Sequence, residues 1–174
     1  MRVVAGRFGG RRLEAPPGRG TRPTADRVRE AVFSLLGPVE GILVLDLFAG
    51  SGALGIEALS RGAAAAEFVE RDVRAAAVVR RNLAELGVEA PVHRRDALAF
   101  LAETRARFDL VFVDPPYSSA RRLAGPLSER LPAVLAPCAR IVSESNKREP
   151  LSLALPLAGE RAYGDTLIAV HRAP

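Results

Sequence analysis

Four consecutive residues, Asp114-Pro115-Pro116-Tyr117, follow the apolar segment 108–113 and carry the clearest chemical signal in this sequence. Two prolines cannot continue a central strand, because they lack the backbone donor that pairing requires. The segment therefore leaves the sheet as a stiff turn, in which the Asp114 carboxylate and the Pro115 carbonyl could accept the two hydrogens of a base amine. Tyr117 offers a flat face on which that base can stack. We interpret all four residues as catalytic in methyl transfer to a planar amine, against the alternative of a chance turn.

A glycine-rich segment over 50–55 matches the pattern G-x-G-x-x-G, between a predicted strand and a predicted helix. At such a loop a ligand meets backbone N–H groups and a helix N-terminus, while an acid about 20 residues further on binds ribose hydroxyls. Glu70 has that spacing from Gly50. Nicotinamide, flavin and S-adenosylmethionine enzymes share this geometry, and the glycines could instead serve only a tight turn, so the pattern alone does not identify the ligand.

Three acids, Asp46, Glu70 and Asp96, follow three successive predicted strands. They would meet at the carboxyl edge of a parallel sheet, where open α/β folds bind ligands. A carboxylate at Asp46 would repel a pyrophosphate but attract the sulfonium and ammonium groups of S-adenosylmethionine. Asp96, followed by Ala97, could accept from an adenine amino group, so we predict S-adenosylmethionine as the cofactor. The predicted cofactor-binding residues are Asp46, Phe48, Ala49, Gly50, Ser51, Gly52, Glu70, Arg71, Asp96, Ala97 and Asp114.

Apolar periodicity predicts the elements that position these residues. Strands are expected over 42–48, 66–70, 92–94, 108–114 and 141–144, with helices ending near 61 and spanning 73–86, 97–107 and part of 119–136. Such alternation indicates an α/β fold with a mostly parallel sheet covered by helices on both faces. The tail, over 157–163 and 166–172, predicts a hairpin that turns at Gly164-Asp165 and adds an antiparallel element at one edge.

The first thirty residues hold eight arginines against three acids, a net charge of +5, whereas the other 144 carry 17 basic and 17 acidic groups. A cationic arm on a neutral body is typical of polyanion binding, and a solvated basic tail is the alternative. The arm contains a possible hairpin pairing 2–5 with 12–15. Apolar residues at helical spacing then predict a helix that Thr24 caps, that runs through Leu36 and that Gly37-Pro38 ends. The residues predicted to contact such a polyanion are Arg7, Arg11, Arg12, Arg22, Thr24, Arg27 and Arg29.

The composition is that of an ordinary globular chain, with 48% hydrophobic and 26% charged residues over 174 positions. No apolar run approaches the roughly 20 residues of a membrane span, and no signal-peptide core is visible at the N-terminus. Cys138 is the single cysteine, so we expect no disulfide framework, no metal site and a reducing cytoplasm. We interpret Cys138 as a small packing residue, and His93 and His171 as structural.

The segments 46–52 (DLFAGSG) and 114–117 (DPPY) together resemble class I amino-methyltransferases. The segment 22–33 (RPTADRVREAVF), with the opening 2–6 (RVVAG) and the closing 163–166 (YGDT), is similar to the bacterial 16S rRNA guanine-N2 methyltransferases. The resemblance runs over essentially the whole chain and is weakest near 150–158. It implies a Rossmann-like fold of seven strands in a single methyltransferase domain over 1–174, with a basic extension over 1–37 and a catalytic core over 38–174.

The resemblance also implies roles for the candidate residues. Asp46 and the glycine loop would hold the methionine end of the cofactor, Glu70 the ribose, and Asp96 with Ala97 the adenine. The target guanine would be turned out of its stack into a pocket beside Asp114 and Tyr117. The substrate would be 16S rRNA in a partly assembled small subunit, bound by a monomer whose arginines, Arg22, Arg27 and Arg29 among them, contact the phosphates.

Other functions share parts of this pattern. DNA adenine-N6 methyltransferases also use Asp-Pro-Pro-Tyr, but they normally need an insertion that reads duplex sequence, and no gap between the predicted strands is long enough. A protein-glutamine N-methyltransferase would typically have Asn at the position of Asp114. A non-catalytic RNA-binding module would use the basic arm and ignore the cofactor.

Overall fold

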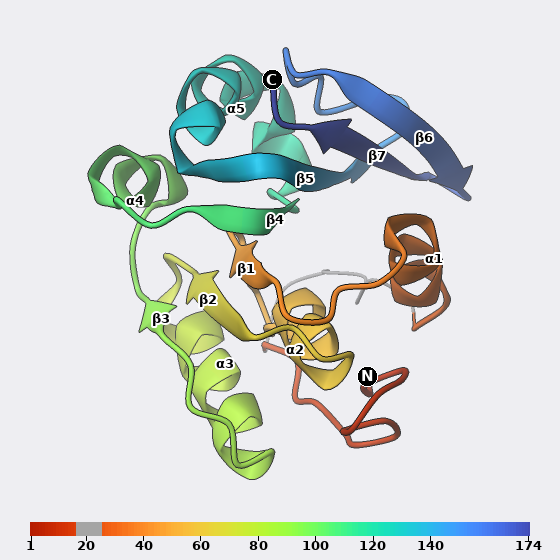
Figure 1. Ribbon diagram of the computed structural model, residues 1–174, viewed down its shortest axis with the longest axis vertical. Helices are drawn as coiled ribbons and strands as arrows, with labels where there is room; N and C mark the ends of the chain where they lie inside the picture. Colours follow the sequence, from red (N-terminus) through yellow and green to blue (C-terminus); the bar gives the residue numbers. More distant parts are fainter. Residues whose placement is uncertain (17–25) are drawn as a thin grey trace.

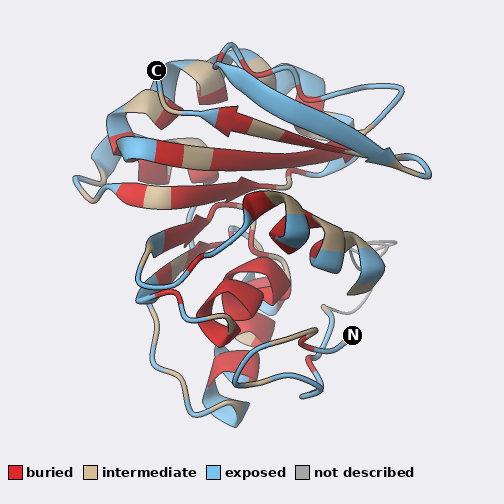
Figure 2. Ribbon diagram, turned by 45° about the vertical axis from the view of Figure 1, so that its right-hand side comes forward, coloured by how far each residue is buried: buried red, intermediate tan, exposed pale blue. Residues whose placement is uncertain are grey.

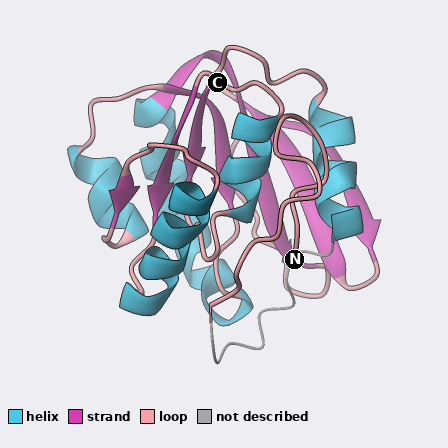
Figure 3. Ribbon diagram, turned by 90° about the horizontal axis from the view of Figure 1, so that it is seen from below, coloured by secondary structure: helices cyan, strands magenta, loops and turns pink. Residues whose placement is uncertain are grey.

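Within residues 1–16 and 26–174, which the computed structural model describes, seven strands form one mixed sheet with helices on both faces (Figures 1 and 3). The helices are α1 (Asp26–Leu36), α2 (Ala53–Ser60), α3 (Val73–Glu85), α4 (Ala97–Glu103), α5 (Tyr117–Arg130) and the 3-10 turn η1 (Leu131–Val134). The strands are β1 (Leu43–Asp46), β2 (Ala65–Val69), β3 (Val92–His93), β4 (Phe108–Val113), β5 (Leu135–Asn146), β6 (Leu157–Tyr163) and β7 (Thr166–Arg172).

The strand order is β3-β2-β1-β4-β5-β7-β6, and the strands from β3 to β5 are parallel. β7 runs antiparallel between β5 and β6, and the hairpin of β6 and β7 forms the edge that the closing hairpin was expected to provide. β2 and β3 lie on one side of β1, whereas β4 and the later strands lie on its other side, so the strand order reverses between β1 and β4. Ligands of open α/β sheets bind outside the carboxyl ends of the strands at such a switch point. The predicted α/β fold is confirmed, and its switch point lies where Asp46 and Asp114 end neighbouring strands.

Both faces of the sheet are buried against apolar side chains (Figure 2). Along β4, Leu110 and Phe112 join the cluster that packs on α1 and α2, whereas Val111 and Val113 join the cluster under α4 and α5. This alternation is the two-residue period of a strand that is buried on both sides. α1 contacts the sheet through Phe33, whose ring centroid lies 5.8 Å from that of Phe112.

The elements differ from prediction where backbone geometry overrides the apolar pattern. α4 ends at Glu103 rather than 107, because Thr104 is extended with φ −68° and ψ 142°. β5 is longer than the predicted 141–144, and its pairing with β4 slips, since Phe108 faces Leu135 but Leu110 faces Arg140. Cys138 lies in this irregularity with φ 63° and is exposed. Its interpretation as a packing residue was therefore wrong.

The N-terminal residues 1–16 are hydrogen-bonded to α2. The expected hairpin is present as a single antiparallel bridge between Arg2 and Arg12. The buried carboxylate of Glu57 accepts from the backbone N–H groups of Val4 at 2.7 Å and Ala5 at 3.0 Å. These contacts contradict a loose basic tail for residues 1–16, whereas the division at 37 into extension and core stays a prediction.

Arg29 was predicted to bind RNA, and the structure contradicts this. Its side chain is fully buried, because residue 29 lies on the inward face of α1 with Val32, Phe33 and Leu36. It donates to Asp26 Oδ1 at 2.7 Å and to the backbone carbonyl of Arg2, so it joins α1 to the N-terminal segment. The predicted contacts of Arg22 and Thr24, including the helix cap, lie outside the described residues. Among the described helices, none is long and apolar enough to cross a membrane.

Replacing Arg29 with Gln should lower the free energy of unfolding by about 1–3 kcal/mol, because it leaves the Arg2 carbonyl without its donor and breaks an ion pair whose other member, Asp26, is partly exposed. Arg27→Gln is the matched control, since Arg27 is exposed on the same helix, and it should change stability by at most about 0.5 kcal/mol. Urea denaturation followed by circular dichroism measures both values. Equal stabilities of the two variants would contradict a role for Arg29 in holding α1 to the N-terminal segment.

Candidate active site

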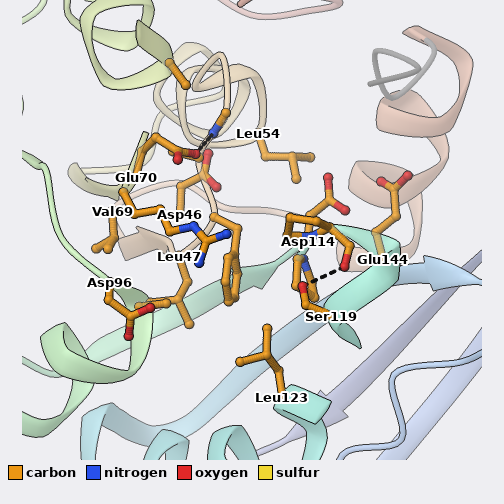
Figure 4. A pocket seen from close by; sticks show the side chains of 18 of the residues that line it. Asp46, Leu47, Leu54, Val69, Glu70, Asp96, Asp114, Ser119, Leu123 and Glu144 are labelled. Atoms are coloured by element: carbon orange, nitrogen blue, oxygen red, sulfur yellow. Dashed lines mark hydrogen bonds between the residues drawn. The ribbon is translucent and has the colours of Figure 1, made fainter. Parts of the chain in front are cut away.

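A cavity of about 1060 Å³ opens at the carboxyl ends of β1, β2 and β4. Its volume is at the upper end of the roughly 300–1,000 Å³ typical of small-molecule sites. Figure 4 shows Asp46, Glu70 and Asp96 toward one side of this pocket, and Asp114 with Glu144 toward the other. The pocket brings together these predicted residues: Asp46, Phe48, Ala49, Gly50, Ser51, Glu70, Arg71, Asp96, Ala97, Asp114, Pro115, Pro116 and Tyr117.

The backbone N–H groups of the glycine loop are bonded to the acids of the pocket. Asp46 Oδ2 accepts from Gly55 N at 3.0 Å, and Glu70 Oε2 accepts from Gly50 N at 2.9 Å. We expected these donors to face a ligand. A pyrophosphate would find two of them taken by acidic side chains and would be repelled by the negative charge there. The loop therefore fits a ligand that carries positive charge and no phosphate, which is the character of S-adenosylmethionine.

Gly52 is the one predicted cofactor-binding residue that does not line the cavity. It has φ +81°, and its Cα faces Val79, Ile56 and Phe68 in the core. A Cβ at Gly55 would likewise lie only 2.4 Å from Cε1 of Phe68. These two glycines permit the turn and the close packing of α2 on the sheet, and cofactor binding by Gly52 stays a prediction.

Asp46 is a buried acid with an unusual protonation equilibrium. Only 2% of the surface of this residue is exposed. Burial raises the pKa of Asp46 to about 7, the Gly55 N–H opposes that rise, and the nearby negative charge of Glu70 adds to it. A cation placed in the pocket would favour the ionised form and so would be bound with release of a proton.

Glu70 and Asp96 are held by local backbone contacts. The second oxygen of Glu70, Oε1, accepts from the backbone N–H of Asp72 at 2.8 Å, and this fixes the carboxylate at the end of β2. Asp96 is exposed at the N-terminus of α4, where Oδ1 accepts from Leu98 N at 2.9 Å and Ala99 N at 3.2 Å. Both acids line the cavity, and each one also stabilises the element that follows it.

The Asp-Pro-Pro-Tyr segment turns from the end of β4 directly into α5, which begins at Tyr117. The Pro116 carbonyl accepts from both the backbone N–H and the hydroxyl of Ser119, at 2.8 and 2.9 Å. These bonds hold the turn that carries Asp114 and Pro115. Tyr117 is 42% exposed, so its ring stands at the rim of the pocket.

Glu144 lines the same cavity, and sequence reasoning missed it. It is buried on β5, and because Val113 pairs with Ser143 in parallel register, Asp114 and Glu144 occupy the next matched positions. The pKa of Asp114 lies well above its ordinary value, first because the carboxyl is buried, then because Glu144 and Asp46 are negative. The polar run Ser143-Glu144-Ser145 inside a buried strand was the signal, but its meaning depends on β5 lying beside β4.

The described arginines of the arm differ in their surroundings. Arg7, Arg11, Arg12 and Arg27 are exposed, and Arg11 also donates to the Glu85 carbonyl at 2.7 Å. The histidines are tied into the fold, His93 by Glu67 at 2.8 Å and His171 by the Leu155 carbonyl at 3.2 Å. In the part of the chain that the structure describes, no group of three or more His, Cys, Asp or Glu side chains could hold a metal ion.

Comparison with known proteins decides the family. The family model described as conserved hypothetical protein 95 matches residues 1–172. The ribosomal RNA small subunit methyltransferase D of Haemophilus influenzae is 39% identical over 159 residues, which cover 87% of this chain and 81% of that protein. The chain belongs to this family. The family member of Escherichia coli K12 is 46% identical over 119 residues, or 67% of this chain and 60% of that protein, so this match spans less than two thirds of the relative.

Solved structures agree with this family assignment. The Escherichia coli protein yhhF superposes with a TM-score of 0.84 at 36% identity, covering 99% of this chain and 97% of that one. An RNA methyltransferase of Salinibacter ruber, solved with S-adenosyl-L-homocysteine, has a TM-score of 0.68 at 20% identity over 87% of this chain and 94% of that one, and it shows the fold alone. The predicted class I methyltransferase fold and the predicted family resemblance are thus confirmed.

Replacing Asp46 with Asn should change how stability depends on pH. The folded pKa of about 7 exceeds the ordinary 3.8, so the folded protein keeps a proton that the unfolded chain releases. This contribution is full below the unfolded pKa and is lost as the pH rises through about 7. Relative to Asp46→Asn, which retains an acceptor for Gly55 N, the unliganded wild type should lose roughly 2–4 kcal/mol between pH 4 and 8.

Urea denaturation of both proteins at one-unit pH intervals gives the two profiles. Parallel profiles would contradict the elevated pKa of Asp46. Circular dichroism of Asp46→Asn at neutral pH serves as the control for an intact fold.

Proposed function

We propose that this protein transfers a methyl group from S-adenosylmethionine to the exocyclic N2 amine of one guanine in 16S rRNA, within the small ribosomal subunit or its assembly intermediate. The observation that carries the proposal is a cavity that holds two kinds of acceptor, the loop-bound acids Asp46 and Glu70 and the strand-end motif that begins at Asp114. The names of the relatives, which refer to the small-subunit ribosomal RNA, support the substrate. The protein acts in ribosome biogenesis, in the cytoplasm and as a monomer.

The cofactor half of the pocket suits S-adenosylmethionine. The cationic methionine end of the cofactor lies against Asp46 and the loop residues from Phe48 to Ser51. The ribose hydroxyls lie against Glu70, and the adenine lies against Asp96 and Ala97. Asp96 has one oxygen engaged as a helix cap, so the carboxylate retains acceptor capacity for an amino group. When bound, the cofactor supplies an electrophilic methyl group, and the N–C bond forms as the S–C bond breaks with its electron pair left on sulfur.

The base half of the pocket suits a planar amine. The Asp114 carboxylate and the Pro115 carbonyl accept the two N2 hydrogens, which turns the nitrogen lone pair toward the methyl group. The nitrogen must lose one proton after methylation, and the raised pKa of Asp114 makes its carboxylate a suitable acceptor for that proton. Tyr117, at the rim, stacks on the guanine after it leaves the RNA helix.

The exposed arginines of the arm supply contacts to phosphates. The exposed arginines are Arg7, Arg11, Arg12 and Arg27. The segment that holds the first three is hydrogen-bonded to α2, so their charges lie at the surface of a fixed part of the fold. Arg22 and Thr24 are included from the sequence alone. Arg29 is not, because its guanidinium is buried.

Methylation assays with labelled cofactor test the substrate directly. We expect wild-type protein to label small subunits from a strain that lacks the corresponding gene, at one guanine found by mass spectrometry of nuclease digests, and to leave plasmid DNA unlabelled. Asp114→Ala should lower turnover by at least about 10³-fold while cofactor affinity stays within roughly tenfold, because Asp114 acts mainly on the amine.

The rival functions predict other outcomes. A DNA adenine-N6 methyltransferase would label the plasmid and leave the RNA unlabelled. A non-catalytic RNA-binding module would show no binding of S-adenosylmethionine in calorimetry even at millimolar ligand. Near-normal turnover by Asp114→Ala would contradict the role of this carboxylate.

Substituting the exposed arm arginines should weaken binding to the small subunit and flatten its dependence on salt. Changing Arg7, Arg12 or Arg27 to Gln removes a positive charge that pairs with a phosphate, so each change should reduce the slope of log K against log [salt] by about 0.7–0.9. Arg105→Gln is the matched control, because Arg105 is equally exposed but lies in the loop before β4, outside the arm. Filter binding over a range of salt gives the slopes. Equal slopes for arm variants and control would show that the arm does not contact phosphates.

A further inference from the structure

Glu144 stands beside Asp114 because of the register between β4 and β5. Val113 pairs with Ser143 in parallel, so residues 114 and 144 are the next matched pair as β4 ends. Matched positions on neighbouring parallel strands point to the same face of the sheet, and the strands lie about 4.8 Å apart. Both carboxylates line the cavity, and Figure 4 shows them together on the side away from Glu70 and Asp96.

Asp114 and Glu144 place two carboxyl groups in one partly closed pocket. Glu144 is only 8% exposed, and its negative charge opposes ionisation of Asp114. A Gln or a Leu at position 144 would relieve that repulsion. Two neighbouring acceptors suit a ligand edge that presents several hydrogen-bond donors side by side.

The Watson–Crick edge of guanine is such an edge. It carries three adjacent hydrogens, one on N1 and two on N2, whereas adenine presents an acceptor at N1 next to its amine. In the function proposed above, Asp114 and the Pro115 carbonyl accept the two N2 hydrogens. One further acceptor, displaced to the side of Asp114, is then needed for N1–H, and β5 places the Glu144 carboxylate on that side.

We propose that Glu144 accepts the N1–H of the target guanine and thereby selects guanine over bases whose N1 is an acceptor. This inference rests on the proposed function and names the residue that determines the base. Glu144 accepts a hydrogen bond and takes no proton, since the proton released from N2 goes to Asp114. A base with an acceptor at N1 places its lone pair against a buried carboxylate, which a site built for a donor rejects strongly.

The test uses small subunits reconstituted with guanosine or 2-aminopurine riboside at the target position. Both bases carry the same N2 amine, but 2-aminopurine has a lone pair in place of N1–H and a hydrogen in place of O6, so the comparison among variants at residue 144 isolates the N1 contact. Wild-type protein should methylate guanosine with a kcat/KM roughly 10²–10³-fold higher than 2-aminopurine. Glu144→Gln presents an amide N–H as well as a carbonyl, so it should lose most of the guanosine rate and reduce the preference to within about tenfold.

Two further variants separate base reading from simple damage. Glu144→Asp keeps the acceptor but withdraws it by one methylene, so it should react more slowly with guanosine yet retain the preference. Glu149→Gln is the matched control, because Glu149 is exposed in the turn after β5, and both rates should equal those of wild type. Calorimetric titration with S-adenosylmethionine shows that each variant has a folded cofactor site.

The outcomes are distinct. If Glu144→Gln slows both substrates equally and leaves the preference unchanged, the inference is overturned and Glu144 only shapes the pocket. If wild-type protein leaves the guanosine subunits unmethylated, the proposed function itself fails, and this inference with it. Loss of the preference in Glu144→Gln, with its retention in Glu144→Asp, supports the assignment.

Discussion

Two hydrogen bonds join the glycine loop to the acids at the ends of β1 and β2, from Gly55 N to Asp46 and from Gly50 N to Glu70. They hold the loop in place and put negative charge at the N-terminus of α2, where helix geometry favours it. They also reverse the usual character of a G-x-G-x-x-G loop, because donors that would bind phosphate already bind carboxylate. The class of ligand that this pocket accepts follows from these two contacts.

The charges of the two halves of the pocket are coupled. Burial raises the pKa of Asp114 most, and the negative charges of Glu144 and then of Asp46, at the end of the neighbouring strand β1, raise it further. A cationic cofactor placed beside Asp46 offsets part of that negative charge, so it makes ionisation of Asp114 easier. In the proposed function, cofactor binding would therefore prepare Asp114 to accept an amine, and the switch point between β1 and β4 brings the two acids close together.

Local patterns in the sequence predicted what depends on local physics. The closing hairpin matches its predicted strands, since the Gly-Asp turn marks where the chain reverses, and the strand-end acids fell at the expected edge of the sheet. Glu144 could not be assigned, because its meaning depends on which strand lies beside β4. The burial of Arg29 could have been predicted, since positions 29, 32, 33 and 36 share one face of a helix. Counting charge over 1–30 missed it, because that count treats every arginine as solvated.

The helix that follows the glycine loop also fixes the basic arm. α2 begins next to Gly52, and its Glu57 accepts backbone N–H groups of Val4 and Ala5 near its other end. A Cβ at Gly6 would lie 1.9 Å from the Ser60 carbonyl oxygen, so this segment packs against α2 with no space for a side chain. The arginines of residues 1–16 therefore keep a set position relative to the pocket. In the proposed function, arm contacts to phosphate would set the register of the RNA, while the acceptors in the pocket would read the base.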